Sequence, residues 1–323
     1  MKKSLKVKVK LISFITTFTV MSSILLPQIA EASNKCGSAE DMAMSMPANH
    51  PHAMGTGVTK TAVGYTLEIL KTPMLNTDNT IKYRFTNKGK VVKDFTLDMG
   101  KVSHLIVYSS DYKTYIHTHP YVDQTGVFTS VLPIKSQGTY NFVTDTSVPL
   151  KDKSVNPSIQ LLLGGSFNYG SKSNPIAMAK PKCSVISNGY KISLSDTEVK
   201  TSHGTLMVTI SDLNGNPVNF GQFLGARAHL VVIKDKEHTY AHFHPMNADG
   251  SMPPMWGSDV NVAKSDPKKI NASKSDIINK NDSMPGMLHF MTEPPGPGRY
   301  MAFMQFVDKG ILKTVQFTLD AVN

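Results

Sequence analysis

The segment His104-Leu-Ile-Val-Tyr108, followed by Tyr115-Ile-His-Thr-His-Pro120, occurs twice in this chain. Its second copy reads His229-Leu-Val-Val-Ile233 and Tyr240-Ala-His-Phe-His-Pro245, displaced by 125 positions without a gap. In both copies two short apolar runs flank a polar turn, which is typical of a β-hairpin. An internal repeat of this kind predicts two similar domains, each containing the same hairpin.

The repeat extends in both directions beyond the hairpin. Toward the N-terminus the offset of 125 is kept by the pairs Gly100/Gly225, Phe95/Phe220, Phe85/Ile210, Ile81/Leu206 and Tyr65/Tyr190. Toward the C-terminus the offset becomes 160, as in Gly126/Gly286, Gly138/Gly298 and Tyr140/Tyr300. The second copy therefore contains 35 additional residues after Pro245, which we expect to form a long loop beside the second His-x-His.

The hydrophobic pattern within each copy has the period of a β-strand. Apolar and polar residues alternate over 65–70, 81–85 and 206–210, and turn-forming residues occur at 87–89 and 212–217. No segment carries a sustained apolar stripe with helical spacing. The pattern predicts an all-β chain of two tandem antiparallel β-sandwich domains, of immunoglobulin-like or cupredoxin-like type.

The N-terminal segment has the features of a secretory signal peptide. Five lysines up to Lys10 precede an apolar stretch, and Ala30-Glu-Ala32 provides a small-residue cleavage site. The apolar stretch is too short and too polar for a membrane anchor, and no later segment is apolar enough to span a bilayer. We therefore expect residues 1–32 to be removed, and the mature protein to be secreted or extracytoplasmic in the cell envelope, with no transmembrane segment.

The rest of the chain divides into four parts. We expect a disordered Met- and His-rich leader at 33–59, a first β-sandwich domain at 60–170, a linker at 171–182 and a second β-sandwich domain at 183–323. The second domain carries its loop insertion at about 246–285. Within that insertion Met252, Met255 and Trp256 are candidates for a lid over the second site.

The two cysteines, Cys36 and Cys183, both lie outside the repeated hairpins. This placement argues against a cysteine-ligated metal site. Export would permit a disulfide between them, which would join the leader to the interdomain linker. The sequence leaves open whether this bond forms.

The charge pattern excludes one class of partner. The formal net charge of +10 falls to +6 once five lysines and Glu31 are removed, which leaves 29 basic and 23 acidic residues. These charges are scattered, whereas a nucleic-acid-binding protein would show a basic stripe with interleaved aromatic residues. We therefore expect no nucleic-acid partner.

The hairpin geometry brings three histidines of each copy to one face. If the first turn centres on residues 111–112, His104 lies opposite His119, and residue 106 lies opposite His117. Residues 117 and 119 point to the same face of their strand, and a cross-strand partner shares that face. With the second turn centred on residues 236–237, the same reasoning groups His229, His242 and His244.

Three neutral imidazoles that converge from rigid strands favour a transition-metal site. Imidazole nitrogen binds zinc, copper, nickel and iron, and three ligands leave a coordination position for water, methionine or a substrate. We predict copper as the ion, with zinc as the alternative. The competing interpretation is that these histidines form polar pairs or hydrogen bonds within the hairpin and bind no ion.

Further candidate ligands occur outside the two trios. His289 stands where the first domain has Thr129, so we predict it as an additional ligand of the second site. Thioether sulfur favours Cu(I). The leader contains a run of methionine and histidine: Met42, Met44, Met46, His50, His52 and Met54. That run is either a copper-capturing segment or ordinary low-complexity sequence.

No motif for catalysis occurs in the chain. It lacks a Gly-x-Ser-x-Gly nucleophile elbow, a phosphate-binding glycine loop and a His-Glu-x-x-His zinc motif. We therefore predict that the protein is not an enzyme. Two alternatives remain open: a metal-dependent enzyme that uses the vacant coordination position, and a structural or adhesive module of the cell envelope whose histidines are not ligands.

The combination of His-Leu-x-Val, an Asp-containing turn and His-x-His-Pro resembles a family of secreted bacterial β-sandwich proteins, the heavy-metal-associated or YtkA-like proteins. The likeness covers residues 104–120, 229–245 and the closing segment 298–319. It implies an immunoglobulin-like fold and a link to metal resistance or delivery. The tandem arrangement and the insertion depart from the single-domain form of that family.

Together these features predict an exported transition-metal-binding protein that serves copper sequestration, resistance or delivery. The expected ligand is a transition-metal ion, and the expected protein partner is a membrane metal transporter or another component of the cell envelope. Affinity should fall at acid pH, because protonated histidine cannot coordinate a metal.

Overall fold

The computed structural model describes residue 36 and residues 64–97, 101–149, 158–223, 226–234, 239–246, 277–278 and 284–323. These residues belong to one compact unit, which spans residues 34–323. Among them, no helix is long and apolar enough to cross a membrane. The predicted signal peptide, nearly all of the predicted leader and most of the predicted insertion lie outside the described residues, so the domain boundaries stay predictions.

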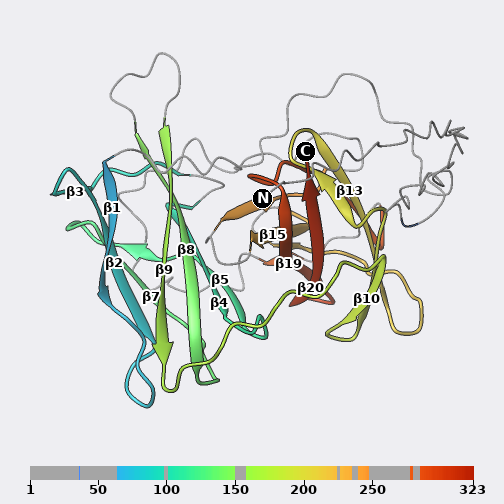
Figure 1. Ribbon diagram of the computed structural model, residues 1–323, viewed down its shortest axis with the longest axis horizontal. Helices are drawn as coiled ribbons and strands as arrows, with labels where there is room; N and C mark the ends of the chain where they lie inside the picture. The colour runs from blue at the N-terminus through green and yellow to red at the C-terminus, as the bar shows by residue number, and fades with distance from the viewer. Residues whose placement is uncertain are drawn as a thin grey trace, which may run out of the picture. The chain divides into compact units, whose positions relative to one another are not determined.

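The first β-sandwich consists of two antiparallel sheets (Figure 1). One sheet has the order β1-β2-β7-β6, with β3 paired to β2. Its strands are β1 (Tyr65–Lys71), β2 (Thr80–Asn87), β3 (Lys90–Val91), β6 (Tyr121–Val122) and β7 (Val127–Val131). The other sheet has the order β5-β4-β8-β9. Its strands are β4 (Ser103–Ser109), β5 (Tyr115–Thr118), β8 (Gly138–Pro149) and β9 (Ser158–Tyr169).

The second β-sandwich repeats this plan with additions at its edges. One sheet has the order β10-β11-β13-β18, built from β10 (Ser184–Ser187), β11 (Tyr190–Leu194), β13 (Gly204–Asp212) and β18 (Met287–Thr292). The other has the order β12-β20-β19-β15-β16, built from β12 (Glu198–Lys200), β15 (Ala228–Lys234), β16 (Tyr240–Phe243), β19 (Gly298–Asp308) and β20 (Ile311–Val322). A short pair, β14 (Gln222–Phe223) and β17 (Ile277–Ile278), completes it. Strand β12 runs parallel to β20, while the other strand pairs of the described residues are antiparallel.

The strand orders confirm the all-β prediction of two tandem sandwiches of immunoglobulin-like type. The order β1-β2-β7 recurs as β11-β13-β18, and β5-β4-β8-β9 recurs as β16-β15-β19-β20. A tyrosine corner marks the same place in each copy. The hydroxyl of Tyr140 donates to the carbonyl of Ser136 (2.7 Å), and that of Tyr300 donates to the carbonyl of Gly296 (2.8 Å). This contact is a hallmark of immunoglobulin-like sandwiches.

Two glycines explain why the repeat is also visible after the insertion. Gly126 and Gly286 both adopt positive φ angles, of 83° and 75°, which favour glycine. A Cβ atom would lie 2.4 Å from the carbonyl oxygen of Val92 at the first position and 2.7 Å from Cβ of Pro217 at the second. Each copy therefore needs glycine at this turn.

Alternation along the strands builds a separate hydrophobic core in each sandwich. In β2, the side chains of Ile81, Tyr83 and Phe85 are fully buried, whereas Lys82 between them is exposed. Burying a side chain of this size contributes roughly 1.5–3 kcal/mol to stability. In the second sandwich Leu206 belongs to the corresponding core.

Strands β4 and β15 are buried on both faces. Leu105 and Val107 of β4 face the core of the first sandwich, while Ile106 on the opposite face belongs to a third apolar cluster. That cluster also contains Val231 of β15 and Phe303 of β19, so it joins the two sandwiches. The outer face of this hairpin, which includes the histidines, therefore lies at a contact between sandwiches and not in solvent.

A disulfide joins Cys36 to Cys183, with 5.1 Å between their Cα atoms. The main-chain N–H of Cys36 also donates to the carbonyl of Ser195 (3.0 Å). The bond, which the sequence left open, attaches the N-terminal segment to the start of the second sandwich. It closes a loop of the chain around the whole first sandwich, with a sequence separation of 147.

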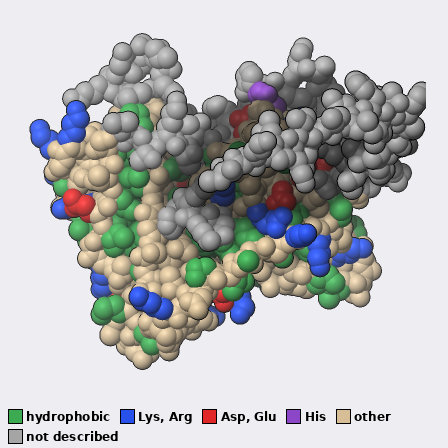
Figure 2. Space-filling model, viewed as in Figure 1, with side chains coloured by type: hydrophobic (Ala, Val, Ile, Leu, Met, Phe, Trp, Pro, Cys, Tyr) green, Lys and Arg blue, Asp and Glu red, His purple; other side chains and the backbone are tan. Residues whose placement is uncertain are grey.

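Charged side chains pair locally on the surface. Arg84 binds Glu68 across β1 and β2 (2.7 Å), and Arg299 binds Asp320 with two hydrogen bonds across β19 and β20 (2.7 and 2.8 Å). Figure 2 shows lysine and arginine side chains spread over the described part of the visible face, with acidic side chains among them.

Candidate metal centre

Both histidine hairpins have the register that the sequence predicts. Ile106 lies opposite His117 in the pairing of β4 with β5, and Val231 lies opposite His242 in the pairing of β15 with β16. Continuing either ladder by two residues brings the first histidine of each hairpin, such as His104, opposite the last. All three histidines of a hairpin therefore share one face.

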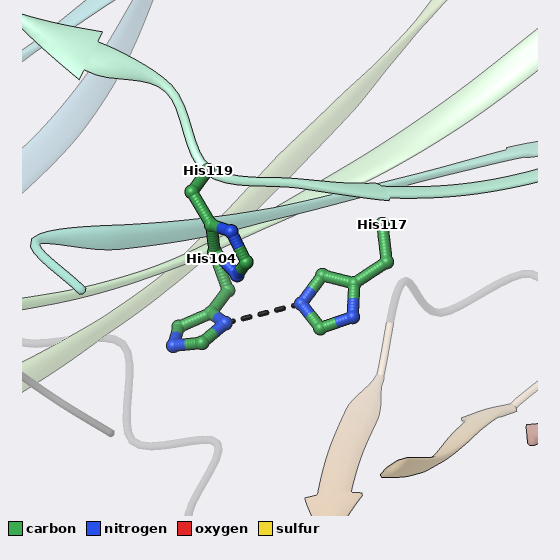
Figure 3. Close-up of side chains that lie close together, drawn as sticks. All are labelled: His104, His117 and His119. Atoms are coloured by element: carbon green, nitrogen blue, oxygen red, sulfur yellow. Dashed lines mark hydrogen bonds between the residues drawn. The ribbon is translucent and has the colours of Figure 1, made fainter. Parts of the chain in front are cut away.

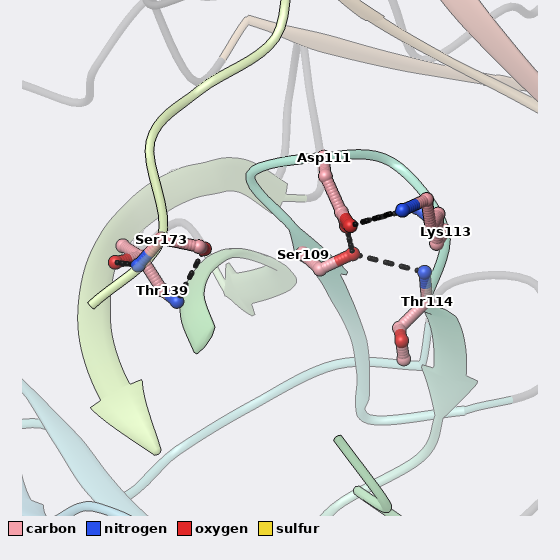
Figure 4. Close-up of polar contacts among 6 residues, drawn as sticks. All are labelled: Ser109, Asp111, Lys113, Thr114, Thr139 and Ser173. Atoms are coloured by element: carbon pink, nitrogen blue, oxygen red, sulfur yellow. Dashed lines mark hydrogen bonds and ion pairs between the residues drawn. The ribbon is translucent and has the colours of Figure 1, made fainter. Parts of the chain in front are cut away.

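The turn of the first hairpin is held by its own side chains (Figure 4). The Asp111 carboxylate accepts hydrogen bonds from Oγ of Ser109 (2.6 Å) and from the main-chain N–H of Lys113 (3.2 Å). Oγ of Ser109 in turn accepts a hydrogen bond from the main-chain N–H of Thr114 (2.9 Å). Such local contacts fix where the chain reverses, and so they fix which residues of β4 and β5 face each other.

In the first sandwich, three imidazoles converge (Figure 3). Nδ1 of His104 lies 3.1 Å from Nε2 of His117, and the ring of His119 stands 4.8 Å from that of His104. One nitrogen from each of the three rings lies within 4.8 Å of the other two. His104 and His117 are 1% and 9% exposed, so the cluster is shielded from solvent.

The second sandwich carries the same arrangement in a tighter form. Nδ1 of His229 lies 2.9 Å from Nε2 of His242 and 3.0 Å from Nε2 of His244. His229 and His242 are 1% and 2% exposed. We call these two groups the first triad (His104, His117 and His119) and the second triad (His229, His242 and His244).

The nitrogen–nitrogen distances fit a metal ion. A tetrahedral ion that binds imidazole at about 2.0–2.1 Å holds its ligand nitrogens about 3.3 Å apart. The nearest nitrogen pairs in the two triads lie 2.9–3.1 Å apart. These nearest nitrogens therefore need to move apart by only roughly a few tenths of an ångström to accept an ion.

The other ring nitrogen of two of these histidines is held by an oxygen acceptor. The Nε2–H of His229 donates to the main-chain carbonyl of Phe223 (2.8 Å), so the lone pair of this ring is on Nδ1, which faces His242. The Nδ1–H of His117 donates to Oε1 of Gln305 (3.3 Å), so its lone pair is on Nε2. Acceptors of this kind orient the rings of metal-binding histidines and raise their basicity.

Burial keeps the imidazoles neutral. It lowers the pKa of His117, His119, His242 and His244 well below the usual value of 6.5, and neighbouring imidazoles lower it further. Burial also lowers the pKa of His229 to about 4, against the opposing effect of its hydrogen bond to a main-chain carbonyl. Neutral imidazole is the form that binds a metal ion, so these rings are ready to coordinate at neutral pH.

The two triads lie against each other. The ring centroids of His104 and His242 are 5.6 Å apart, those of His117 and His242 are 5.4 Å apart, and those of His117 and His229 are 5.9 Å apart. Within the triads the centroids are 4.5–5.3 Å apart. The sequence suggested one separate site per domain, whereas the structure places six rings in a single cluster.

The family model described as "Domain of unknown function (DUF8832)" matches residues 60–155 and 184–323, more than half of the chain. The chain belongs to the DUF8832 family. Both triads of this DUF8832 protein lie within the matched segments. No curated protein matches the chain.

Solved structures resemble this DUF8832 protein only distantly. A mutant of Salmonella α2-macroglobulin has 12% identity and a TM-score of 0.21; the match covers 86% of this chain and only 16% of that protein. Domains 4 and 5 of the S-layer protein SbsC have 10% identity and a TM-score of 0.20, with 80% and 98% covered. The D00-D0 domain of intimin has 10% identity and a TM-score of 0.18, with 80% and 100% covered. Likenesses this weak support no argument about function.

His289 of the DUF8832 protein lies outside the groups of converging ligand atoms that the described residues form. On β18 it stands between the buried Leu288 and Phe290, so alternation places its side chain on the outer face of that sheet. Its main-chain carbonyl accepts a hydrogen bond from the N–H of Met246 (2.8 Å). Its role as an additional ligand stays a prediction, and residues 42–54 and 252–256 lie outside the described residues.

The sequence did not identify Phe223, Gln305 and Asp145 as parts of the cluster. Phe223 contributes its main-chain carbonyl, and a contact of the main chain cannot be predicted from a side-chain motif. Gln305 lies directly opposite His229 in the ladder of β15 with β19, and Asp145 lies directly opposite His104 in the ladder of β4 with β8. The two residues therefore occupy equivalent places, but they differ in type, and a search for identical residues passes over them.

Proposed function

We propose that this DUF8832 protein is an exported protein that binds transition-metal ions, with copper as the first candidate and zinc as the second. Its ligands are the first and second triads: His104, His117, His119, His229, His242 and His244. The observation that carries the proposal is the convergence of neutral imidazole nitrogens 2.9–3.1 Å apart on rigid strands. Ligands held in this way need little rearrangement to receive an ion.

Copper is preferred over zinc on chemical grounds. For a given set of nitrogen ligands, affinity for Cu(II) exceeds affinity for Zn(II). Three imidazoles also leave one coordination position open for a further ligand. We infer sequestration, resistance or delivery as the biological role, in agreement with the resemblance to heavy-metal-associated proteins, and assign no catalytic role.

We place the protein outside the cytoplasm. Disulfides persist in oxidising compartments and are rare in the cytosol, and the bond between Cys36 and Cys183 is consistent with export. The signal-like N-terminal segment supports the same location. A membrane metal transporter or another envelope component is the partner expected there.

Metal titration tests the proposed function. Purified protein is titrated with Cu(II) and with Zn(II) beside two variants, His117→Ala/His119→Ala and His242→Ala/His244→Ala. Wild type should bind two ions per chain, each variant one, and the combined four-fold variant none. The control is His203→Asn, because the His203 side chain is 66% exposed, lies beside Glu293 and belongs to neither triad. Asparagine is chosen because it tolerates the positive φ angle of this position. Binding by the four-fold variant equal to that of wild type would refute the proposal.

A further inference from the structure

The two sandwiches meet through equivalent faces. Their contact consists of nine buried residues: Ile106, Tyr108, Tyr112, Val143, Val231, Ile233, Tyr240, Met301 and Phe303. Ile106 and Val231 correspond in the repeat, as do Val143 and Phe303. A contact in which each partner uses the same surface is isologous, as in a two-fold symmetric dimer. Within this single chain the two sandwiches are thus related by an approximate two-fold axis at the contact.

The histidines obey the same symmetry. The contact of His104 with His242 (5.6 Å) and that of His229 with His117 (5.9 Å) are the same contact seen from either sandwich. His117 and His242, which correspond to each other, are 5.4 Å apart. The rings of the two triads are therefore in direct contact with each other.

The second sandwich also supports the triad of the first. Gln305 belongs to the second sandwich, yet its Oε1 accepts the hydrogen bond from His117 of the first triad (3.3 Å). Asp145 holds the equivalent place in the first sandwich, directly opposite His104. Nδ1 of His242 is buried and has no hydrogen-bond partner among the described residues.

We propose that the two triads form one dinuclear metal centre, which holds two transition-metal ions next to each other across the contact between the sandwiches. The proposal rests on the proposed function, because each triad must bind an ion. It adds that the two triads are adjacent and that an ion bound to one triad changes the binding of an ion to the other. Asp145, directly opposite His104, is a buried carboxyl group (1% exposed) that accepts a hydrogen bond from Gln160 (2.7 Å).

Two consequences distinguish this centre from two isolated sites. Two divalent cations in a shielded cluster repel each other, so the second ion should bind more weakly than the first, by between about 5-fold and 150-fold. Two Cu(II) ions held this close also have interacting electron spins. Isolated sites would each bind with the affinity of the corresponding single-triad variant, and their spins would not couple.

The test is electron paramagnetic resonance of the full chain loaded with one and then two equivalents of Cu(II). At two equivalents we expect a spin-coupled spectrum with a half-field line. The variants His117→Ala/His119→Ala and His242→Ala/His244→Ala should each bind one ion and give an uncoupled spectrum. Phe303→Glu keeps all six histidines but places a carboxylate in the apolar contact, so it should bind two ions without spin coupling. If that variant does not fold, Tyr115→Ala replaces it, because Tyr115 stacks on Phe303 (4.4 Å between centroids).

The outcomes separate the two proposals. An absence of stoichiometric copper binding in wild type overturns the proposed function. Two tightly bound ions, with a spectrum equal to the sum of the two single-triad variants, overturn the dinuclear centre and leave the proposed function intact. Spin coupling that persists in a folded Phe303→Glu protein would also overturn the assignment of the centre to this contact.

Discussion

At the scale of single residues, the hydrogen bond made by one ring nitrogen of a histidine determines which nitrogen can bind an ion. A nitrogen that donates its N–H to an oxygen leaves the lone pair on the other nitrogen of the ring. His229 donates to the carbonyl of Phe223 and presents Nδ1, whereas His117 donates to Gln305 and presents Nε2. A ring without such an acceptor can present either nitrogen and loses part of its pre-organisation. Under the proposed function, residues that do not touch the ion would therefore contribute to its affinity.

Gln305→Leu should weaken metal binding by the first triad about 10- to 100-fold, because His117 loses the acceptor that orients it. The effect would be measured by Cu(II) titration of the His242→Ala/His244→Ala protein, in which only the first triad remains. Gln316→Leu is the matched control, since it makes the same change at an exposed position of β20. An unchanged affinity in the Gln305→Leu protein would show that this hydrogen bond does not position the ligand.

At the scale of elements, the hairpin determines the geometry of the triad. Asp111→Ala should lower the free energy of unfolding by about 1–2 kcal/mol, because the turn loses charge-assisted hydrogen bonds from Ser109 and Lys113. Lys113→Ala is the comparison: its side chain is 80% exposed and pairs only loosely with Asp111 (3.3 Å), so it should change stability by less than about 0.5 kcal/mol. Urea denaturation measures both. Equal losses would show that the hydrogen bonds accepted by Asp111 do not account for the loss of stability.

The sequence predicted this element well because its register depends on local rules. The position of a short polar turn sets which residues pair, and strand alternation then sets the shared face, so the pairing of Ile106 with His117 followed from spacing alone. The burial of the outer face did not follow, because it depends on the other sandwich. One signal was present: residues 104–108 and 229–233 are apolar on both faces, which indicates a strand covered on both sides.

At the scale of the whole molecule, the disulfide between Cys36 and Cys183 closes a long loop of the chain that contains the first sandwich. Cys36→Ser/Cys183→Ser should lower the free energy of unfolding by about 2–4 kcal/mol while keeping the fold, because the unfolded chain loses a long closed loop. Thermal denaturation of the variant and of reduced wild type should give the same shift in Tm. A variant as stable as oxidised wild type would mean that the bond contributes nothing to stability.

The metal-free protein should lose stability as the pH falls from about 6.5 to about 4. Histidines in the unfolded chain bind protons near pH 6.5, whereas burial lowers the pKa of His229 to about 4 and that of four other triad histidines in the same direction. Over this window the unfolded state therefore binds more protons than the folded state, and stability decreases toward acid pH. The contribution is complete above pH 6.5. For His229 alone the loss of stability amounts to roughly 3 kcal/mol.

Denaturation in the presence of a chelator at several pH values measures how steeply stability depends on pH. This slope should flatten in the four-fold histidine variant. An identical slope in that variant would assign the acid sensitivity to the carboxylates of the protein. Saturating Cu(II) at pH 7 should raise the Tm of wild type but not that of the variant, because only wild type binds the ion in its folded state.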